Sequence, residues 1–373
     1  MFSSMGVISM NIVHKRSLLT VWVSVWMLSA CGGSGSGDDS STQVQSSSPS
    51  GEVSGSSSGS ATVSDNTTDN TGDNGTGSDD SGSEAPELNT DTGTALTSGS
   101  TDGVLCDYFY NEFNDSASVQ MTSNADWSCT GIARLLTANG IPDHQTGTFP
   151  NSGNPNTISE APVSVSYPLT PEQTDTVSTL GGPRGATGYV LNGVKIDANT
   201  AGSCDDSGNS CSLVGNTGNW HIEALGQTSF DFGTDDNNAH VQPNGSYHYH
   251  GMPEGFIAMR GGSESSMTLI GWAADGFPIY ARYGFSDAQD AGSALKVMTG
   301  SYQLVQNVSN SRPATSVYAL GTFAQDWEYV AGSGDLDECN GRYGVTPEFP
   351  QGIYHYYATD TYPYFQRCVK GKL

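Results

Sequence analysis

From residue 104 onward, apolar and polar positions alternate over short runs, and turn-forming residues separate the runs. This alternation has the period of a β-strand, whose successive side chains point to opposite faces. Such runs occur at 163–167, 188–191, 220–223, 247–250, 267–272 and 279–283. Dipeptides typical of tight hairpins begin at Asn139, Asn192, Asn244, Asp275 and Asn340. Helical periodicity is scarce, and short helices are expected only near 133–138 and 288–297. The pattern predicts a mainly antiparallel β domain, a sandwich or barrel with long loops and few short helices.

The N-terminal 31 residues have the pattern of an export signal. Lys15 and Arg16 precede an apolar stretch at 18–30 that is too short to span a bilayer. The stretch ends in Leu-Ser-Ala-Cys-Gly at 28–32, which resembles a bacterial lipoprotein signal. This resemblance implies that Cys31 becomes the lipidated first residue. Gly32 in the next position resembles the pattern that sorts lipoproteins to the outer membrane.

A polar segment at 32–103 separates the signal from the β domain. It consists largely of Ser, Gly, Asp, Thr and Asn, holds 12 acidic residues, and contains no Lys or Arg. Such a segment cannot bury enough apolar area to offset the entropy lost on ordering. It is therefore predicted to be a disordered acidic tether, with residues 104–373 forming the folded domain.

The charge of the predicted domain narrows the class of partner. Residues 104–373 hold 27 acidic and 11 basic side chains, a net charge of −16. Nucleic-acid binding needs clustered positive charge, so it is not expected here. Contact with the membrane is expected through the lipid anchor alone. The sequence leaves open whether an extracellular small molecule, a glycan or a protein is the partner.

Six cysteines remain after Cys31, an even number in an exported chain, and this predicts three disulfides. Pairing between nearest neighbours gives Cys106–Cys129, Cys204–Cys211 and Cys339–Cys368. The second pair encloses a turn-rich loop that brings its two ends together. A thiolate metal site is the alternative, but the spacings lack a CxxC pair.

A Gly-x-Tyr-His-Tyr sequence occurs twice, at 245–249 and 352–356. On a strand, His248 and His250 project from one face while Tyr247 and Tyr249 project from the other. In the second copy, His355 and Tyr357 share one face, and Tyr354 and Tyr356 share the opposite face. Of the six histidines that follow the signal, three lie in or directly after these two runs: His248, His250 and His355. This concentration indicates a functional site.

Two histidines at i and i+2 on a strand direct both imidazoles toward one metal ion. His240 precedes His248 and His250 across a predicted turn at 243–245, so a hairpin would return it to the same face. Glu254 and His355 are the further expected ligands. Imidazole with carboxylate suits Zn, Cu, Fe or Mn, and spacing alone does not choose among these metals. The competing interpretation is a hydrogen-bonded ladder of aromatic and imidazole rings that rigidifies the sheet.

Several ordered motifs resemble the YHYH-domain family. They lie at 139–144, 192–194, 240 with 247–250, 271–280, 335–342, 345–350 and 352–356. The resemblance covers roughly 104–371. It implies a secreted or lipid-anchored bacterial domain and names no reaction.

A second resemblance concerns the metal ligands. His248, His250, Glu254 and Gly261 resemble most of a first cupin motif, and 344–355 resembles the second, with His355 as its ligand. The chain departs from the cupin pattern at Gln242 and Thr359. This resemblance implies a cupin barrel that holds its metal through three histidines and a glutamate.

The sequence also offers weaker candidates for site residues and alternative functions for the domain. His144, Asp275 and Tyr357 are secondary site candidates, and the acidic segment 231–238 offers oxygen ligands for Ca²⁺ without matching an EF-hand. A solvated loop is the favoured interpretation of that segment, because Asp and Asn also favour turns. A surface module that binds glycan or protein through exposed aromatic residues is the main alternative to a metal site. A metal-free hydrolase is a third hypothesis, although no nucleophile motif supports it. Whether the domain is an enzyme stays open.

Overall fold

The structure is a computed structural model that describes residues 89–90, 106, 108–215 and 217–373. The predicted signal at 1–31, with Cys31, and nearly all of the predicted tether at 32–103 lie outside the described residues. Within the tether range, Asn89–Thr90 forms a two-residue strand, β1, which pairs in parallel with β2. The sequence pattern did not predict this strand.

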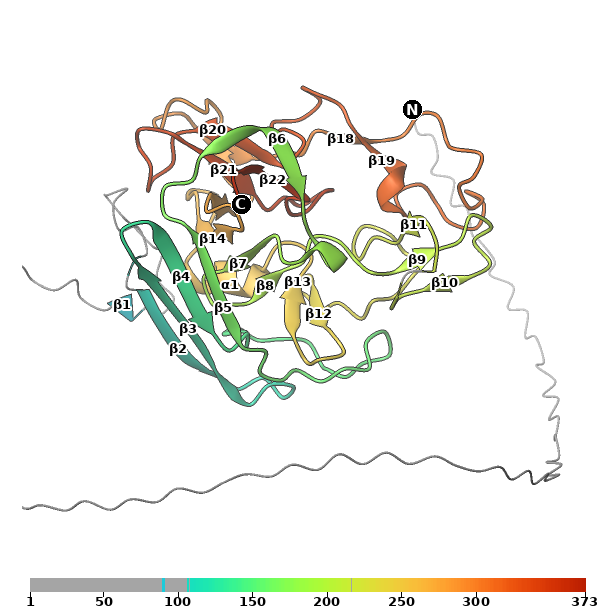
Figure 1. Ribbon diagram of the computed structural model, residues 1–373, viewed down its shortest axis with the longest axis horizontal. Coiled ribbons are helices and arrows are strands. Elements are labelled where there is room, and N and C mark those ends of the chain that lie inside the picture. The colour runs from blue at the N-terminus through green and yellow to red at the C-terminus, as the bar shows by residue number, and fades with distance from the viewer. Residues whose placement is uncertain (1–88, 91–105, 107, 216) are drawn as a thin grey trace, which may run out of the picture. The chain divides into compact units, whose positions relative to one another are not determined.

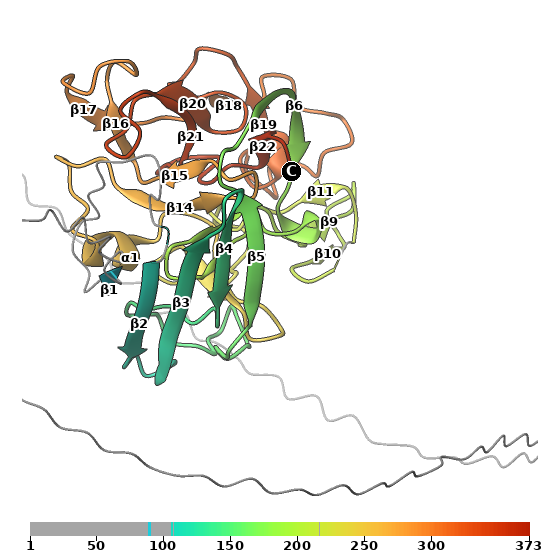
Figure 2. The same ribbon diagram turned by 60° about the vertical axis from the view of Figure 1, so that its left-hand side comes forward.

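Two large sheets dominate the described residues (Figures 1 and 2). The first has the order β1-β2-β3-β4-β5, with β2 at Tyr108–Asn114, β3 at Met121–Cys129, β4 at Ala133–Ala138 and β5 at Val163–Pro168. The second has the order β12-β13-β8-β7-β14-β15-β21-β20. Its strands are β12 (Ala239–Val241), β13 (Tyr247–Tyr249), β8 (Lys195–Ile196), β7 (Gly188–Val190), β14 (Leu269–Ala273), β15 (Pro278–Tyr280), β21 (Ile353–Tyr357) and β20 (Gly341–Gly344). The mainly β fold class is confirmed.

Smaller elements surround these sheets. A three-stranded sheet pairs β10 (Cys211–Ser212), β9 (Ser203–Cys204) and β11 (Trp220–His221). Three two-stranded ribbons pair β16 (Tyr283–Phe285) with β17 (Leu295–Val297), β18 (Tyr302–Leu304) with β19 (Trp327–Tyr329), and β22 (Cys368–Gly371) with β6 (Gln173–Thr179). The described helices are α1 (Glu254–Met259) and the single turns η1 (Gly182–Arg184) and η2 (Ala324–Asp326). Within the described part of the chain, no helix has the length and apolar character needed to cross a bilayer.

The main core joins the two large sheets. Trp127 and Leu136 from the first sheet belong to the same buried cluster as Val190 and Trp272 from the second. The Arg134 guanidinium of β4 lies 3.6 Å from the Trp272 ring centroid, a cation–π contact between the sheets. The alternating burial along β3 and β4 shows why the sequence forms these strands: every second side chain enters the core.

Most tyrosine side chains lie in the interior. Tyr247, Tyr249, Tyr280, Tyr354, Tyr356 and Tyr357 are all buried. Among the described side chains, the exposed large aromatic residues are Phe113, Tyr329 and Tyr343, which belong to three different strands. The described surface therefore lacks the aromatic stripe that a glycan-binding module would present.

The two predicted helices are wrong. Residues 133–138 form strand β4, and 288–297 form a turn followed by β17. Ala and Leu favour a helix at 133–138, but Arg134, Leu136 and Ala138 alternate into the core and the segment pairs with both β3 and β5. Tertiary packing overrides intrinsic propensity here. The strands predicted from alternation are confirmed, except that 279–283 divides between β15 and β16.

All three predicted disulfide pairings are confirmed. Cys106 bonds Cys129, Cys204 bonds Cys211, and Cys339 bonds Cys368. The third closes a loop of 29 residues and joins the start of β22 to the segment that precedes β20.

Candidate metal centre

The β12–β13 hairpin positions three histidines. The turn at 242–245 closes through hydrogen bonds from Gly245 N to Gln242 O (2.8 Å) and from Gln242 N to Ser246 O (2.9 Å). Gly245 has a φ of +87°, a conformation that favours glycine, and a Cβ there would collide with Ser159 Oγ. With this turn, His240 stands directly opposite His248 in the antiparallel register. The hairpin expected from the sequence is therefore present.

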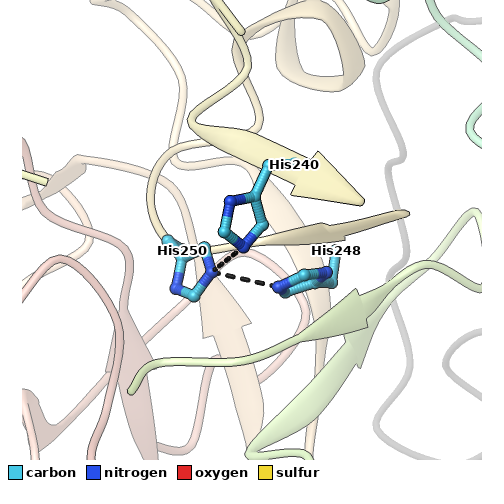
Figure 3. Close-up of side chains that lie close together, drawn as sticks. All are labelled: His240, His248 and His250. Carbon is cyan, nitrogen blue, oxygen red and sulfur yellow. Dashed lines mark hydrogen bonds between the residues drawn. The ribbon is translucent and has the colours of Figure 1, made fainter. Parts of the chain in front are cut away.

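The imidazole nitrogens of this hairpin converge on one point (Figure 3). His250 Nε2 lies 3.0 Å from His248 Nε2 and 3.1 Å from His240 Nε2. One ligand nitrogen from each of the three rings lies within 4.8 Å of the others, and among the described residues this is the one such group of three or more His, Cys, Asp or Glu. We call it the His triad. His248 and His250 are 2% and 4% exposed, so the triad is largely shielded from bulk water.

The backbone holds the second nitrogen of two of the rings. His240 Nδ1 lies 2.8 Å from Phe232 O, and His248 Nδ1 lies 3.2 Å from Ser246 O. A carbonyl oxygen accepts, so both Nδ1 atoms carry the hydrogen, and the Nε2 atoms of His240 and His248 present their lone pairs toward His250 Nε2. Lone pairs this close repel one another unless a cation or a proton lies between them.

Protonation is an unfavourable way to relieve that repulsion. Burial lowers the pKa of His248 well below its usual value, and the neighbouring His250 and His240 lower it further. Burial likewise lowers the pKa of His250, with His240 and Lys195 adding to the effect. The pKa of His240 is also lowered, mainly by burial. The triad is therefore neutral near pH 7, the state in which imidazole binds a metal.

The spacing of the triad fits a metal ion. Imidazole nitrogens that lie about 2.0–2.1 Å from a tetrahedral Zn²⁺ are about 3.3 Å from one another. Three nitrogens on one face of an octahedral ion are about 0.4 Å closer to one another. The separations of 3.0 and 3.1 Å from His250 to the other two rings fall in this range, and the nitrogens of His240 and His248 lie within 4.8 Å of each other. Three protein ligands leave one or more coordination positions for another molecule.

Comparison with known proteins places the chain in a family. Residues 164–371 match the family model described as YHYH protein, which is more than half of the chain. The chain belongs to the YHYH family. The match begins at 164, so β2, β3 and β4 lie outside it, although the sequence resemblance was expected to start near 104. No curated protein and no solved structure matches this chain.

The tyrosines of the YHYH motif face away from the triad, as predicted. Tyr249 OH lies 2.5 Å from His144 Nε2 and accepts a hydrogen bond from Asn192 Nδ2 (3.0 Å). Tyr247 OH donates to Asp235 Oδ2 (2.7 Å). The weaker candidate His144 therefore contacts the opposite side of the motif strand. Its surroundings are those of a side chain that supports the strand.

Glu254 does not reach the triad. It is the first residue of α1, where its carboxylate forms an ion pair with Arg282, which also pairs with Asp360. The prediction that Glu254 is a metal ligand is therefore wrong. The strand ends at Tyr249 and α1 begins at Glu254, so Glu254 does not continue the alternation that places His248 and His250 on one face.

His355 also lies elsewhere. It is on β21, and four strands separate β21 from β13 in the sheet, a distance on the order of 20 Å. His355 Nε2 bonds Tyr357 OH (2.9 Å), and Arg342 Nη2 donates to the same hydroxyl (3.2 Å). The two copies of the motif thus share a sheet but not a site. The ligand set implied by the cupin resemblance, which needs both Glu254 and His355, does not form.

The remaining candidates support turns. Asp275 Oδ2 accepts from Tyr356 OH (2.5 Å) and Gly371 N (2.8 Å), which ties the β14–β15 turn to β22. Burial raises the pKa of Asp275. In the acidic segment 231–238, Asp231 and Asp235 accept backbone hydrogens of their own turns. Their carboxylates do not gather with others around a common point, so the Ca²⁺ expectation gains no geometric basis.

Asp197 was missed by sequence reasoning. It follows β8, which pairs in parallel with β13, and its backbone N donates to Tyr249 O (2.9 Å). Its carboxylate pairs with Lys195 (2.9 Å) and accepts from Gln242 Nε2 (3.2 Å). The only sequence signal is the i, i+2 spacing of Lys195 and Asp197, and nothing in that spacing indicates that β8 adjoins the motif strand.

Proposed function

We propose that this member of the YHYH family binds one divalent transition-metal ion through the Nε2 atoms of His240, His248 and His250. The observation that carries the proposal is the convergence of three neutral imidazoles, two of which are oriented by backbone carbonyls. A hydrogen-bonded ring ladder explains this arrangement less well, because a single hydrogen on His250 Nε2 would have to serve the lone pairs of both His240 and His248.

The donor set narrows the choice of metal. Three imidazoles without a carboxylate suit Zn²⁺, Cu²⁺ or Fe²⁺ better than Mn²⁺, which prefers oxygen ligands. When bound, such an ion supplies Lewis acidity at its open position. The chain's own contribution is to fix the three rings, exclude bulk water from His248 and His250, and keep their nitrogens unprotonated.

Metal titration of the purified, chelator-stripped protein tests the proposal. We expect one equivalent of Zn²⁺ or Co²⁺ per chain by elemental analysis. His248→Ala and His250→Ala should each weaken binding by more than about a hundredfold, since a triad reduced to two ligands loses a direct metal bond.

His221→Ala is the matched control, because His221 lies on β11 and is not part of the triad. It should bind like the unaltered protein. Equal stoichiometry and affinity in the unaltered protein and His248→Ala, or no bound metal in the unaltered protein, would contradict the proposal.

We further propose that the protein is exported and held on the outer membrane by a lipid on Cys31. The support is the signal-like sequence 1–31 and the polar segment that follows it. Disulfide bonding of the domain also fits an oxidising compartment outside the cytoplasm.

Cell fractionation tests the anchor. In a bacterial host the unaltered chain should incorporate radiolabelled palmitate and sediment with outer membranes. Cys31→Ser should lose the label and leave the membrane fraction, whereas Ser29→Ala should keep both. Undiminished labelling of Cys31→Ser would exclude this anchor.

A further inference from the structure

The triad opens onto a cavity. The cavity has a volume of about 890 Å³, and His240, His248 and His250 lie in its wall. This volume is within the range of pockets that enclose small organic molecules, about 300–1,000 Å³. The other wall segments come from separate loops, at 153–156, 182–183, 199–201, 213–215 and 241–244.

The polar side chains of the wall are already engaged within the protein. Asn154 Nδ2 and Asn156 Nδ2 both donate to Val241 O, at 2.9 and 2.8 Å. Asn199 Nδ2 donates to Leu180 O (2.9 Å), and Thr200 Oγ1 donates to Ile222 O (2.6 Å). Because these donors have partners, the wall has few groups left to bond the many hydroxyls of a sugar.

The charges of the wall also restrict the occupant. Among the described lining residues there is no Lys or Arg, and Asp197 is the one acidic residue. The Asp197 carboxylate is occupied by Lys195, Gln242 and the backbone of Gly182. Away from the triad and its proposed ion, the wall therefore lacks a cationic partner for a phosphate, sulfate or carboxylate group in the body of a ligand.

Apolar groups complete the wall. Phe232 is buried beside His240, with ring centroids 5.8 Å apart, and Leu213, Val241 and Pro243 also line the cavity. A ligand in this space would meet apolar carbon over most of its surface and one polar centre at the triad. That combination is typical of small-molecule sites, where a few polar groups orient an apolar body.

From these observations we propose that the cavity binds a small organic molecule with an apolar, uncharged body, which places one nitrogen or oxygen atom on the triad's metal. This inference rests on the proposed metal binding and adds the class of ligand.

Three related probes test the ligand class on the full chain loaded with Co²⁺. Imidazole supplies the metal-binding atom alone, 1-benzylimidazole adds an apolar body, and imidazole-4-acetate adds a negative charge. Binding is followed through the visible absorption of Co²⁺. We expect 1-benzylimidazole to bind at least about tenfold more tightly than imidazole, since its phenyl ring is removed from water. Imidazole-4-acetate should gain nothing.

A variant that fills the cavity sharpens the test. Ala201 lines the cavity and is exposed, so Ala201→Trp should reduce the advantage of 1-benzylimidazole to less than about threefold while Co²⁺ and imidazole still bind. Ala291→Trp, at an exposed alanine outside the cavity, is the matched control and should keep the full advantage.

The outcomes separate the two proposals. Failure to load Co²⁺ overturns the metal centre and the ligand class with it. Normal loading with equal affinity for imidazole and 1-benzylimidazole, or an advantage that survives Ala201→Trp, overturns the ligand class alone. Tighter binding of imidazole-4-acetate than of 1-benzylimidazole also overturns it.

Discussion

At the scale of single residues, the two faces of the motif strand have different tasks. The histidines converge on one side, and the hydroxyls of Tyr247 and Tyr249 hold the other side to Asp235, His144 and Asn192. The tyrosines of this motif are therefore part of what keeps the triad in place, although they do not face it.

Tyr249→Phe tests this role. The change removes one hydroxyl and leaves His144 Nε2 buried without its partner, which should lower the free energy of unfolding by about 1–3 kcal/mol. Urea denaturation measures the effect. Tyr343→Phe is the control, since Tyr343 is 53% exposed, and it should change stability by less than about 0.5 kcal/mol. A Tyr249→Phe protein as stable as the unaltered one would show that this network carries no stability.

Residue patterns predicted the triad but extended it too far. Alternation placed His248 and His250 on one face, and the Asn244-Gly245 turn brought back His240. His355 was added because it lies in the second copy of the motif, and Glu254 because a carboxylate suits a metal; both also resemble cupin ligands. The helix at Glu254 and the four strands between β13 and β21 depend on distant packing, which spacing along the chain does not reveal.

At the scale of elements, the sequence predicted strands well where alternation and turn residues agreed. It failed at β4, where helix-favouring residues obscured an alternating core face. Parallel pairing was also missed: β13 joins β8, and β15 joins β21, through partners remote in sequence. Hairpins leave a local signature, whereas parallel neighbours need a crossover whose length and path are set by the rest of the fold.

The disulfides close loops of different length. In the chain-entropy treatment, closing the 29-residue loop of Cys339–Cys368 contributes about 3.6 kcal/mol, and the 7-residue loop of Cys204–Cys211 about 2.4 kcal/mol. The shorter one joins β9 to β10, just before the cavity wall at 213–215. In the folded state this disulfide therefore ties the start of that wall segment to β9.

At the scale of the whole molecule, buried histidines couple stability to pH. The pKa of His355 is lowered to about 3, chiefly by burial, and those of His248 and His250 are also lowered. In the unfolded chain the same side chains titrate near about 6.5. Below that pH the unfolded state binds more protons than the folded state, so acid favours unfolding. Burial raises the pKa of the Asp275 and Glu348 carboxyls. At these two groups the folded state binds protons more readily than the unfolded state, so acid favours folding there and opposes the effect of the histidines at lower pH.

We therefore expect the metal-free protein to lose stability steadily as the pH falls from about 6.5 toward 4. Urea midpoints of chelator-treated protein measured across this range provide the test. His355→Gln should make the slope shallower, because it removes one of the groups that must stay neutral in the fold. A midpoint that is unchanged between pH 7 and pH 4 would contradict the expectation.

The β12–β13 hairpin has one more consequence, for the order of folding events. All three triad nitrogens belong to a stretch of eleven residues, 240–250, so bringing them together closes only a short loop. Short loops close fast and at little entropic cost, whereas the pairing of β15 with β21 must wait for distant chain. A hairpin of this kind gathers its ligands before the rest of the sheet is complete. An ion bound at the proposed site would then be taken from the compartment in which the chain folds, and the local availability of metals there would decide which one is kept.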